Sequence, residues 1–141
     1  MTASALIDTG AILALLDSSD RWHRICVDAF QELRLPLMTS EAVLTELFHL
    51  VGDSRHEREA AWKLVNSGAI VLATIDNPEL DAIHKLMTRY ADRPMDFAAA
   101  TLVHLARREQ LTTVFTIDLA DFETYRIDGR RRFRILPSNR P

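Results

Sequence analysis

Short runs of apolar residues alternate along the chain with longer segments in which apolar residues recur every three or four positions. The short runs predict buried strands of a parallel sheet, and the longer segments predict amphipathic helices. Strands are expected at residues 5–7, 37–39, 69–72, 113–117 and 133–136. Helices are expected after Thr9 and Gly10 up to residue 16, and at residues 21–33, 41–51, 57–65, 76–90, 92–108 and 119–124. This alternation places the chain in the α/β class with a parallel sheet.

Polar residues mark where several of these helices begin. Ser40 precedes one predicted helix and is a favourable N-cap residue. Asp76 and Glu79 are three residues apart, which is the spacing of a capping box. Pro94, with the two residues before it, is expected to open the helix that runs to residue 108.

Composition narrows the class of protein. The chain has 141 residues, of which 48% are apolar and 26% charged, and residues 1–141 are expected to form a single domain. Neither a signal peptide nor an apolar run of roughly 18 residues is present, so no membrane association is expected. The single Cys26 excludes an internal disulfide and a cysteine zinc site, and fits a cytoplasmic location. A net charge of −3 does not itself indicate nucleic-acid binding, although net charge averages over local patches.

Two carboxylates follow predicted strands directly. Asp8 comes after the first strand and Asp118 after the fourth, and each precedes a helix. Ligands of open parallel sheets bind outside the carboxyl ends of the strands, so both residues stand where a functional site is expected. Both also suit a helix N-cap, and this structural explanation stays open for each.

Glu46 lies in the middle of a predicted helix, where capping does not explain it. Ala42, Val43 and Leu50 share its face at helical spacing, so its carboxylate is expected at the margin of the core-facing side. Glutamate is rarely buried without a partner, and this helix contains no Lys or Arg. A functional role is therefore favoured over a solvated edge position.

Asp96 leads a stripe of small apolar residues at helical spacing, namely Ala99, Ala100 and Val103. This pattern points the carboxylate inward and lets the helix approach the sheet closely. An acid in the first helical turn is also favoured by the helix dipole, which is the alternative explanation.

Four carboxylates at one edge of a sheet would repel one another and raise their pKa values. A divalent cation would relieve this repulsion. Oxygen ligands without cysteine favour Mg²⁺ or Mn²⁺ over zinc. Such a site suits phosphoryl chemistry, in which a metal generates hydroxide from water and stabilises the leaving oxygen.

Four segments together resemble the PIN-domain nucleases, and most closely the VapC toxins of bacterial toxin–antitoxin pairs. They are LIDTGAILALLD at 6–17, SEAVLTEL at 40–47, PMDFAAATLVHLARR at 94–108 and VFTIDLADFETYR at 114–126. Each segment alone is weakly specific, but the four occur in the family's order and spacing and cover nearly the whole chain. The resemblance implies a three-layer α/β/α fold with a central parallel five-stranded sheet.

The resemblance also assigns functional residues. It implies that Asp8, Glu46, Asp96 and Asp118 are the catalytic acids that bind Mg²⁺ or Mn²⁺. Supporting roles are implied for three further residues, Thr9, Thr116 and Asp121. Gly10 is a departure, because the family often has Ser there.

The activity implied is metal-dependent endoribonuclease cleavage of RNA, often tRNA or ribosomal RNA. Family members are usually homodimers, and VapC toxins are silenced by a cognate VapB-type antitoxin that inserts a segment near the active site. Two alternatives stay open: an RNA-processing PIN nuclease without an antitoxin, and a PIN module that binds RNA or protein without cleaving.

Two other classes that place acids at strand ends fit less well. A receiver-like phosphoacceptor needs a Lys at a later strand end, but Lys63 and Lys85 are both predicted in helices. A haloacid-dehalogenase-type phosphatase needs a second Asp two residues after the first, where this chain has Gly10.

Arginines near the C-terminus are candidates for RNA binding. Residues 121–141 contain six arginines against three acids, and Arg126, Arg130, Arg131 and Arg132 are the predicted phosphate contacts. A solvated turn is an equally good explanation of this segment. Further basic residues that can extend the rim are Arg89, Arg93, Arg107 and Arg108.

Overall fold

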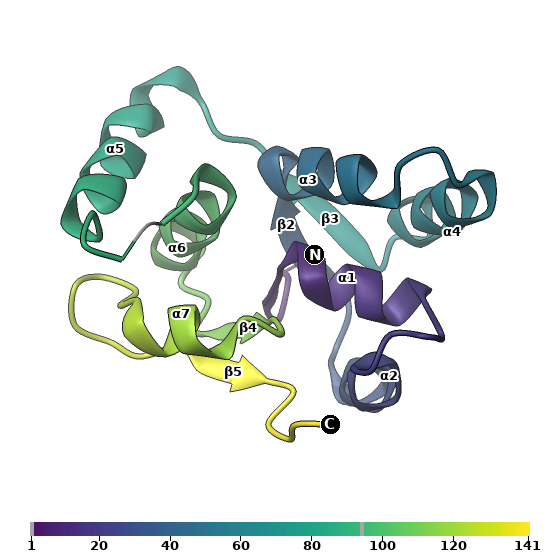
Figure 1. Ribbon diagram of the computed structural model, residues 1–141. Helices are drawn as coiled ribbons and strands as arrows, with labels where there is room; N and C mark the ends of the chain where they lie inside the picture. The colour runs from purple at the N-terminus through teal and green to yellow at the C-terminus, as the bar shows by residue number, and fades with distance from the viewer. Residues whose placement is uncertain (1, 94) are drawn as a thin grey trace.

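The computed structural model describes residues 2–93 and 95–141 (Figure 1). Its centre is a five-stranded sheet in the order β3-β2-β1-β4-β5, and every neighbouring pair is parallel. The strands are β1 (Leu6–Ile7), β2 (Leu37–Ser40), β3 (Ile70–Ala73), β4 (Thr113–Phe115) and β5 (Arg134–Leu136). Both residues of β1 are fully buried, as expected for a central parallel strand covered on both faces.

Helices cover the sheet in an α/β/α arrangement (Figure 1). They are α1 (Thr9–Leu16), α2 (His23–Glu32), α3 (Glu41–Val51), α4 (Arg55–Asn66), α5 (Leu80–Arg89), α6 (Phe97–Glu109) and α7 (Leu119–Thr124), with the 3₁₀ turn η1 (Asn77–Glu79) before α5. Helix α1 packs on α2 and α3, and α6 packs on α3, α5 and β2. The predicted α/β class and parallel five-stranded sheet are confirmed. Within the described residues, no helix is long and apolar enough to cross a membrane.

The sheet reverses its winding direction between β1 and β4. From β1 the chain builds β2 and β3 on one side and then crosses to β4 and β5 on the other. The backbone amide of Asp8 donates to the Phe115 carbonyl over 3.0 Å, so the pairing of the two strands continues one residue past β1. Ligands bind in α/β folds outside the strand ends at such a reversal point.

Several helix starts differ from their predicted positions for local reasons. Helix α6 begins at Phe97, because the Asp96 carboxylate accepts the Ala99 amide over 2.7 Å and acts as the N-cap. The predicted start at residue 92 is wrong, because residues 92–93 and 95–96 are not helical; Pro94 itself lies outside the described residues. Helix α2 begins two residues later than predicted, because Asp20 accepts the Trp22 amide in a turn.

Other boundaries depend on single polar groups or prolines. Ser54 caps α4, which starts two residues earlier than predicted. The helix predicted at 76–90 is divided into η1 and α5, with the Glu79 carboxylate accepting the Asp76 amide over 2.7 Å as predicted for a capping box. Strand β4 ends at Phe115, since the following Thr116 hydroxyl accepts the Asp118 amide and turns the chain.

Candidate active site

A cavity of about 440 Å³ opens at the carboxyl ends of β1 and β4. Its walls include the four predicted acids, which come from four different elements: Asp8, Glu46, Asp96 and Asp118. The remaining lining residues are Gly10, Ala99, Ile117, Asp121 and Tyr125. The fold therefore gathers carboxylates that are up to 110 positions apart in the sequence around one cavity.

Asp8 both caps a helix and faces this cavity. One carboxylate oxygen accepts the Thr9 amide at the start of α1 over 2.8 Å, and the other accepts the Thr116 hydroxyl over 3.2 Å. Burial raises its pKa from 3.8 to about 6, and the negative charges of Glu46 and Asp96 act in the same direction. The Asp8 carboxylate thus caps helix α1 and also lines the acidic cavity, so both explanations given for this residue apply.

Asp118 precedes α7 but its side chain makes no capping hydrogen bond. It lines the cavity, where partial desolvation and the neighbouring Asp121 raise its pKa to about 6. The Thr116 hydroxyl accepts the backbone amide of Asp118 over 3.0 Å. Two carboxylates of this cavity are therefore easier to protonate than isolated aspartates.

Glu46 and Asp96 complete the acidic wall. Glu46 is partly buried on α3, beside the buried Val43 and Leu47. Leu50, which the sequence pattern places on the same core face, is 55% exposed, so that part of the prediction is wrong. The core-facing stripe of α3 runs through residues 43, 47 and 51 instead. Asp96 is exposed at the N-terminus of α6, where it caps the helix rather than pointing into the core.

Comparison with known proteins identifies the family. The PIN domain profile matches residues 5–128. The chain belongs to the PIN domain family. This PIN domain is 29% identical to Ribonuclease VapC26 of Mycobacterium tuberculosis (strain ATCC 25618 / H37Rv), in a match that covers 94% of this chain and 99% of VapC26. Its fold resembles the crystal structure of Mycobacterium tuberculosis VapC20, a sarcin–ricin loop cleaving toxin, with a TM-score of 0.72, 20% identity, and coverage of 84% of this chain and 94% of VapC20.

The donor chemistry of the cavity suits a hard divalent cation. Its ionisable lining groups are carboxylates, apart from Tyr125. The pKa values of Asp8 and Asp118 are raised first by burial and then by neighbouring acids, and a bound cation would offset both effects. As the side chains stand, the carboxylates surround the cavity: among residues 2–93 and 95–141, no three His, Cys, Asp or Glu side chains converge closely enough to hold an ion.

The supporting residues of this PIN domain differ in their contacts. Thr9 is buried, and its hydroxyl donates to the Val43 carbonyl over 3.3 Å, which ties α1 to α3. Asp121 lines the cavity and lies 3.5 Å from Arg93 Nε. Gly10 also lines it, and a Cβ there would be 2.7 Å from Ile117 Cγ1. That close approach explains a glycine at this position.

Sequence reasoning missed Tyr125 as part of the site. Tyr125 is buried, lines the cavity and packs edge-on against Tyr90 and Phe122. Burial raises its pKa well above the ordinary value, with Asp121 and Asp118 acting in the same direction. Tyr125 directly follows α7, four residues after Asp121, and that closeness in the chain was the available signal.

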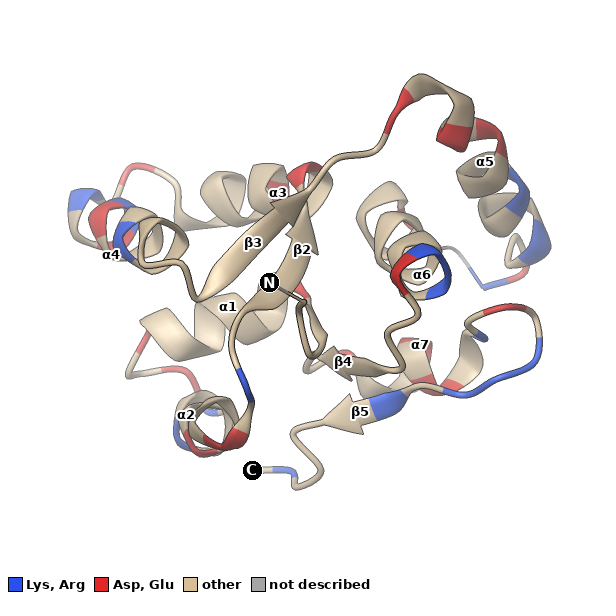
Figure 2. Ribbon diagram, turned by 180° about the vertical axis from the view of Figure 1, so that it is seen from behind, with Lys and Arg blue, Asp and Glu red and all other residues tan. Residues whose placement is uncertain are grey.

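The predicted RNA-binding arginines do not form one uniform surface. Arg126 donates to the backbone carbonyls of residues 123, 124 and 125, and Arg131 is paired with Asp128 over 3.1 Å. Arg130 and Arg132 are exposed in the same turn. The turn carries positive charge beside α5 and the end of α6 (Figure 2).

A second, more apolar cavity of about 630 Å³ adjoins the acidic one. Glu46 and Asp96 line both cavities. Its walls come from α3, the start of α6 and the start of α5, and include Phe97 and Leu80, two exposed apolar side chains. The acids are thus bordered by an apolar surface that is accessible from solvent.

Proposed function

We propose that this PIN domain is a metal-dependent endoribonuclease and the toxin of a VapBC toxin–antitoxin pair. The observation that carries the proposal is the gathering of Asp8, Glu46, Asp96 and Asp118 around one cavity at the reversal point of the sheet. The curated relative is named as a ribonuclease and the structural relative as an RNA-cleaving toxin, which supports RNA as the substrate class, with tRNA or ribosomal RNA the favoured targets.

The four acids would hold Mg²⁺ or Mn²⁺ in this proposal. The bound ion supplies activation of water and neutralisation of charge on the scissile phosphodiester. The chain itself positions the acids. Thr116 orients Asp8 through its hydroxyl and Asp118 through the backbone amide, and the Thr9 amide fixes the other oxygen of Asp8. Catalysis then rests on positioning and electrostatics rather than on a covalent nucleophile.

The partner proposals have separate support. The apolar cavity beside the acids offers a surface for an antitoxin segment, whose Arg would reach the carboxylates by analogy with the family. Exposed Leu35 and Trp62, the latter tilted against the Phe48 ring, offer apolar surface for a homodimer. We further propose that residues 1–141 form one PIN domain, since β5 completes the sheet beyond the matched residues. We also propose a cytoplasmic location, which fits the single Cys26.

The decisive experiment is cleavage of total RNA by the purified, antitoxin-free protein in Mg²⁺, in Mn²⁺ and in EDTA. Discrete fragments are expected only with metal, and Asp96→Asn is expected to abolish them. Asparagine is as good an N-cap as aspartate, so this variant keeps the start of α6 while losing the charge. Asp53→Asn, in the exposed turn between α3 and α4, is the matched control and is expected to cleave normally.

Failure of folded protein to cleave in either metal, with RNA binding intact, would favour a non-catalytic binding module instead. Full activity of Asp96→Asn would overturn the assignment of the acids. Cleavage without any copurifying or genetically adjacent small DNA-binding partner would favour an RNA-processing nuclease over a toxin.

A further inference from the structure

A separate pocket of about 380 Å³ lies between α5, α6 and the turn at residues 127–129. Unlike the acidic cavity, it is lined by cationic side chains: Lys85 and Arg89 come from α5 and Arg107 from α6. Asp81 and Asp128 also line it. None of the residues assigned to cleavage lines this pocket.

Both acids of the pocket are already paired. Asp81 lies 2.9 Å from Lys85 Nζ, and Asp128 lies 3.1 Å from Arg131 Nε. Arg89 and Arg107 form no ion pair with any residue of the described chain, 2–93 and 95–141. The pocket therefore presents two guanidinium groups, which match the geometry of a phosphate through paired hydrogen bonds.

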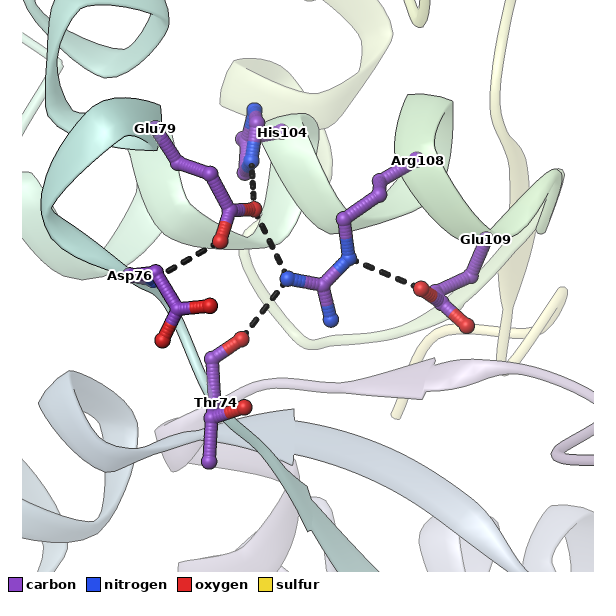
Figure 3. Close-up of polar contacts among 6 residues, drawn as sticks. All are labelled: Thr74, Asp76, Glu79, His104, Arg108 and Glu109. Carbon is purple, nitrogen blue, oxygen red and sulfur yellow. Dashed lines mark hydrogen bonds and ion pairs between the residues drawn. The ribbon is translucent and has the colours of Figure 1, made fainter.

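The next residue, Arg108, bonds to groups outside the pocket. Its guanidinium bonds to Glu79 and to the Thr74 carbonyl, each over 2.7 Å, and to Glu109 over 2.8 Å (Figure 3). His104 lies 2.7 Å from the same Glu79 carboxylate. His104 also lines the pocket, one helical turn before Arg107, whereas Arg107 takes part in none of the bonds just named. The network holds α6 against η1 and leaves Arg107 to the pocket.

Gly129 lines the pocket and lets the Arg89 guanidinium approach the backbone. Gly129 has φ +81°, and a Cβ there would lie 3.2 Å from Arg89 Nη1. A larger residue at 129 would have a strained backbone, and the guanidinium would have to shift by a few tenths of an ångström. The Arg89 guanidinium therefore lies against the backbone of this turn.

Helix α6 connects this pocket to the acids. Asp96 caps its N-terminus and Arg107 lies eleven residues later, a rise of about 16 Å at 1.5 Å per residue. The basic parts of α5, of the end of α6 and of the turn before β5 lie on one side of the molecule (Figure 2). We propose that the pocket binds a backbone phosphate of the RNA substrate, several nucleotides from the bond that is cleaved. This inference rests on the proposed function, and it gives an acidic enzyme a means of holding a polyanion.

The test is binding of a fluorescein-labelled single-stranded RNA of mixed sequence, in EDTA and over a range of NaCl concentrations. Arg89→Gln and Arg107→Gln are each expected to raise Kd about three- to tenfold and to reduce the slope of log K against log[NaCl] by about 0.7. Arg58→Gln removes the same charge from exposed α4, away from the pocket, and is expected to bind as the wild type does. Equal melting curves establish that all three variants are folded.

Wild-type affinity and salt dependence in both pocket variants would overturn the proposal. The proposal would also fail if inorganic phosphate raised the melting temperature of the wild type but of neither pocket variant, while all three proteins bound RNA equally. The pocket would then bind a free anion rather than RNA. Because metal is absent, the result is independent of cleavage. If the wild type cleaves no RNA but the pocket variants bind RNA more weakly than it does, the pocket proposal holds and the nuclease proposal fails. If the wild type cleaves RNA but the pocket variants bind RNA as it does, the nuclease proposal holds and the pocket proposal fails.

Discussion

The Thr116 hydroxyl donates to Asp8 over 3.2 Å, although the two residues are 108 positions apart. The same hydroxyl oxygen accepts the Asp118 amide over 3.0 Å. Thr116 is fully buried, so water does not compete for these bonds. One side chain therefore links the ends of β1 and β4 and positions both carboxylates whose pKa values are raised to about 6.

Thr116→Val keeps the shape of this residue and removes both hydrogen bonds. We expect metal-dependent RNA cleavage to fall about 10- to 100-fold, as for other residues that orient metal ligands, and the free energy of unfolding to fall by about 1 kcal/mol. Thr116→Ser restores the hydroxyl and is expected to recover most of the cleavage. Equal activity of the valine variant would show that the hydroxyl does not position the acids.

Asp8 makes the metal-free protein less stable at neutral pH than in mild acid. Its pKa is about 6 in the folded state against 3.8 ordinarily, so between these values the folded state holds a proton that the unfolded state has released. Stability is therefore expected to fall as pH rises from about 4 to 6 and then to level off.

Asp8→Asn removes this penalty. In EDTA at pH 7, the variant is expected to be more stable than the wild type by about 1–3 kcal/mol, and the difference should shrink at pH 4. Urea unfolding at the two pH values measures it. A variant that is less stable at pH 7, or an advantage that does not change with pH, would contradict the expectation.

Glu79 holds η1 and α6 together. Its pKa is lowered from 4.5 to about 2, first by the hydrogen bond with His104, then by the Asp76 amide and by Arg108. A lowered pKa means that this stabilisation is present above about pH 4.5 and is lost as pH falls toward 2.

Glu79→Gln is expected to lower the melting temperature at pH 7 by several degrees, because Arg108 and His104 lose their charged partner. Asp81→Asn breaks the exposed pair with Lys85 and is the control, with little change expected. Equal melting temperatures of the two variants would mean that the network contributes no more than a surface pair.

Gly10 is constrained by Ile117. In Gly10→Ala the new methyl group would lie 2.7 Å from Ile117 Cγ1, and crowding is expected to outweigh the gain in helix propensity by about 1 kcal/mol. In an Ile117→Ala background the same substitution is expected to be neutral or stabilising. Additive effects in this double-mutant cycle would argue against the contact.

Local signals in the sequence predicted much of the fold. The bounds of α3 and α7 match the predicted ranges 41–51 and 119–124, and Ser40 caps α3 as expected. Departures arise where a side chain bonds to a nearby amide, as Asp96 does to Ala99. Such a bond shifts a helix start without changing the apolar pattern from which the helix is predicted.

The sequence by itself determined the order of strands and helices, the parallel sheet and the acids that follow its strands, because apolar periodicity and capping act between residues close in the chain. Only the tertiary structure decided which distant groups meet. It exposed Leu50, brought Tyr125 to the acidic cavity and placed Arg89 beside Arg107 across two helices. Those contacts depend on how the helices pack on the sheet. Packing brings together residues that are far apart in the sequence, and no periodic pattern of apolar residues indicates which of them will meet.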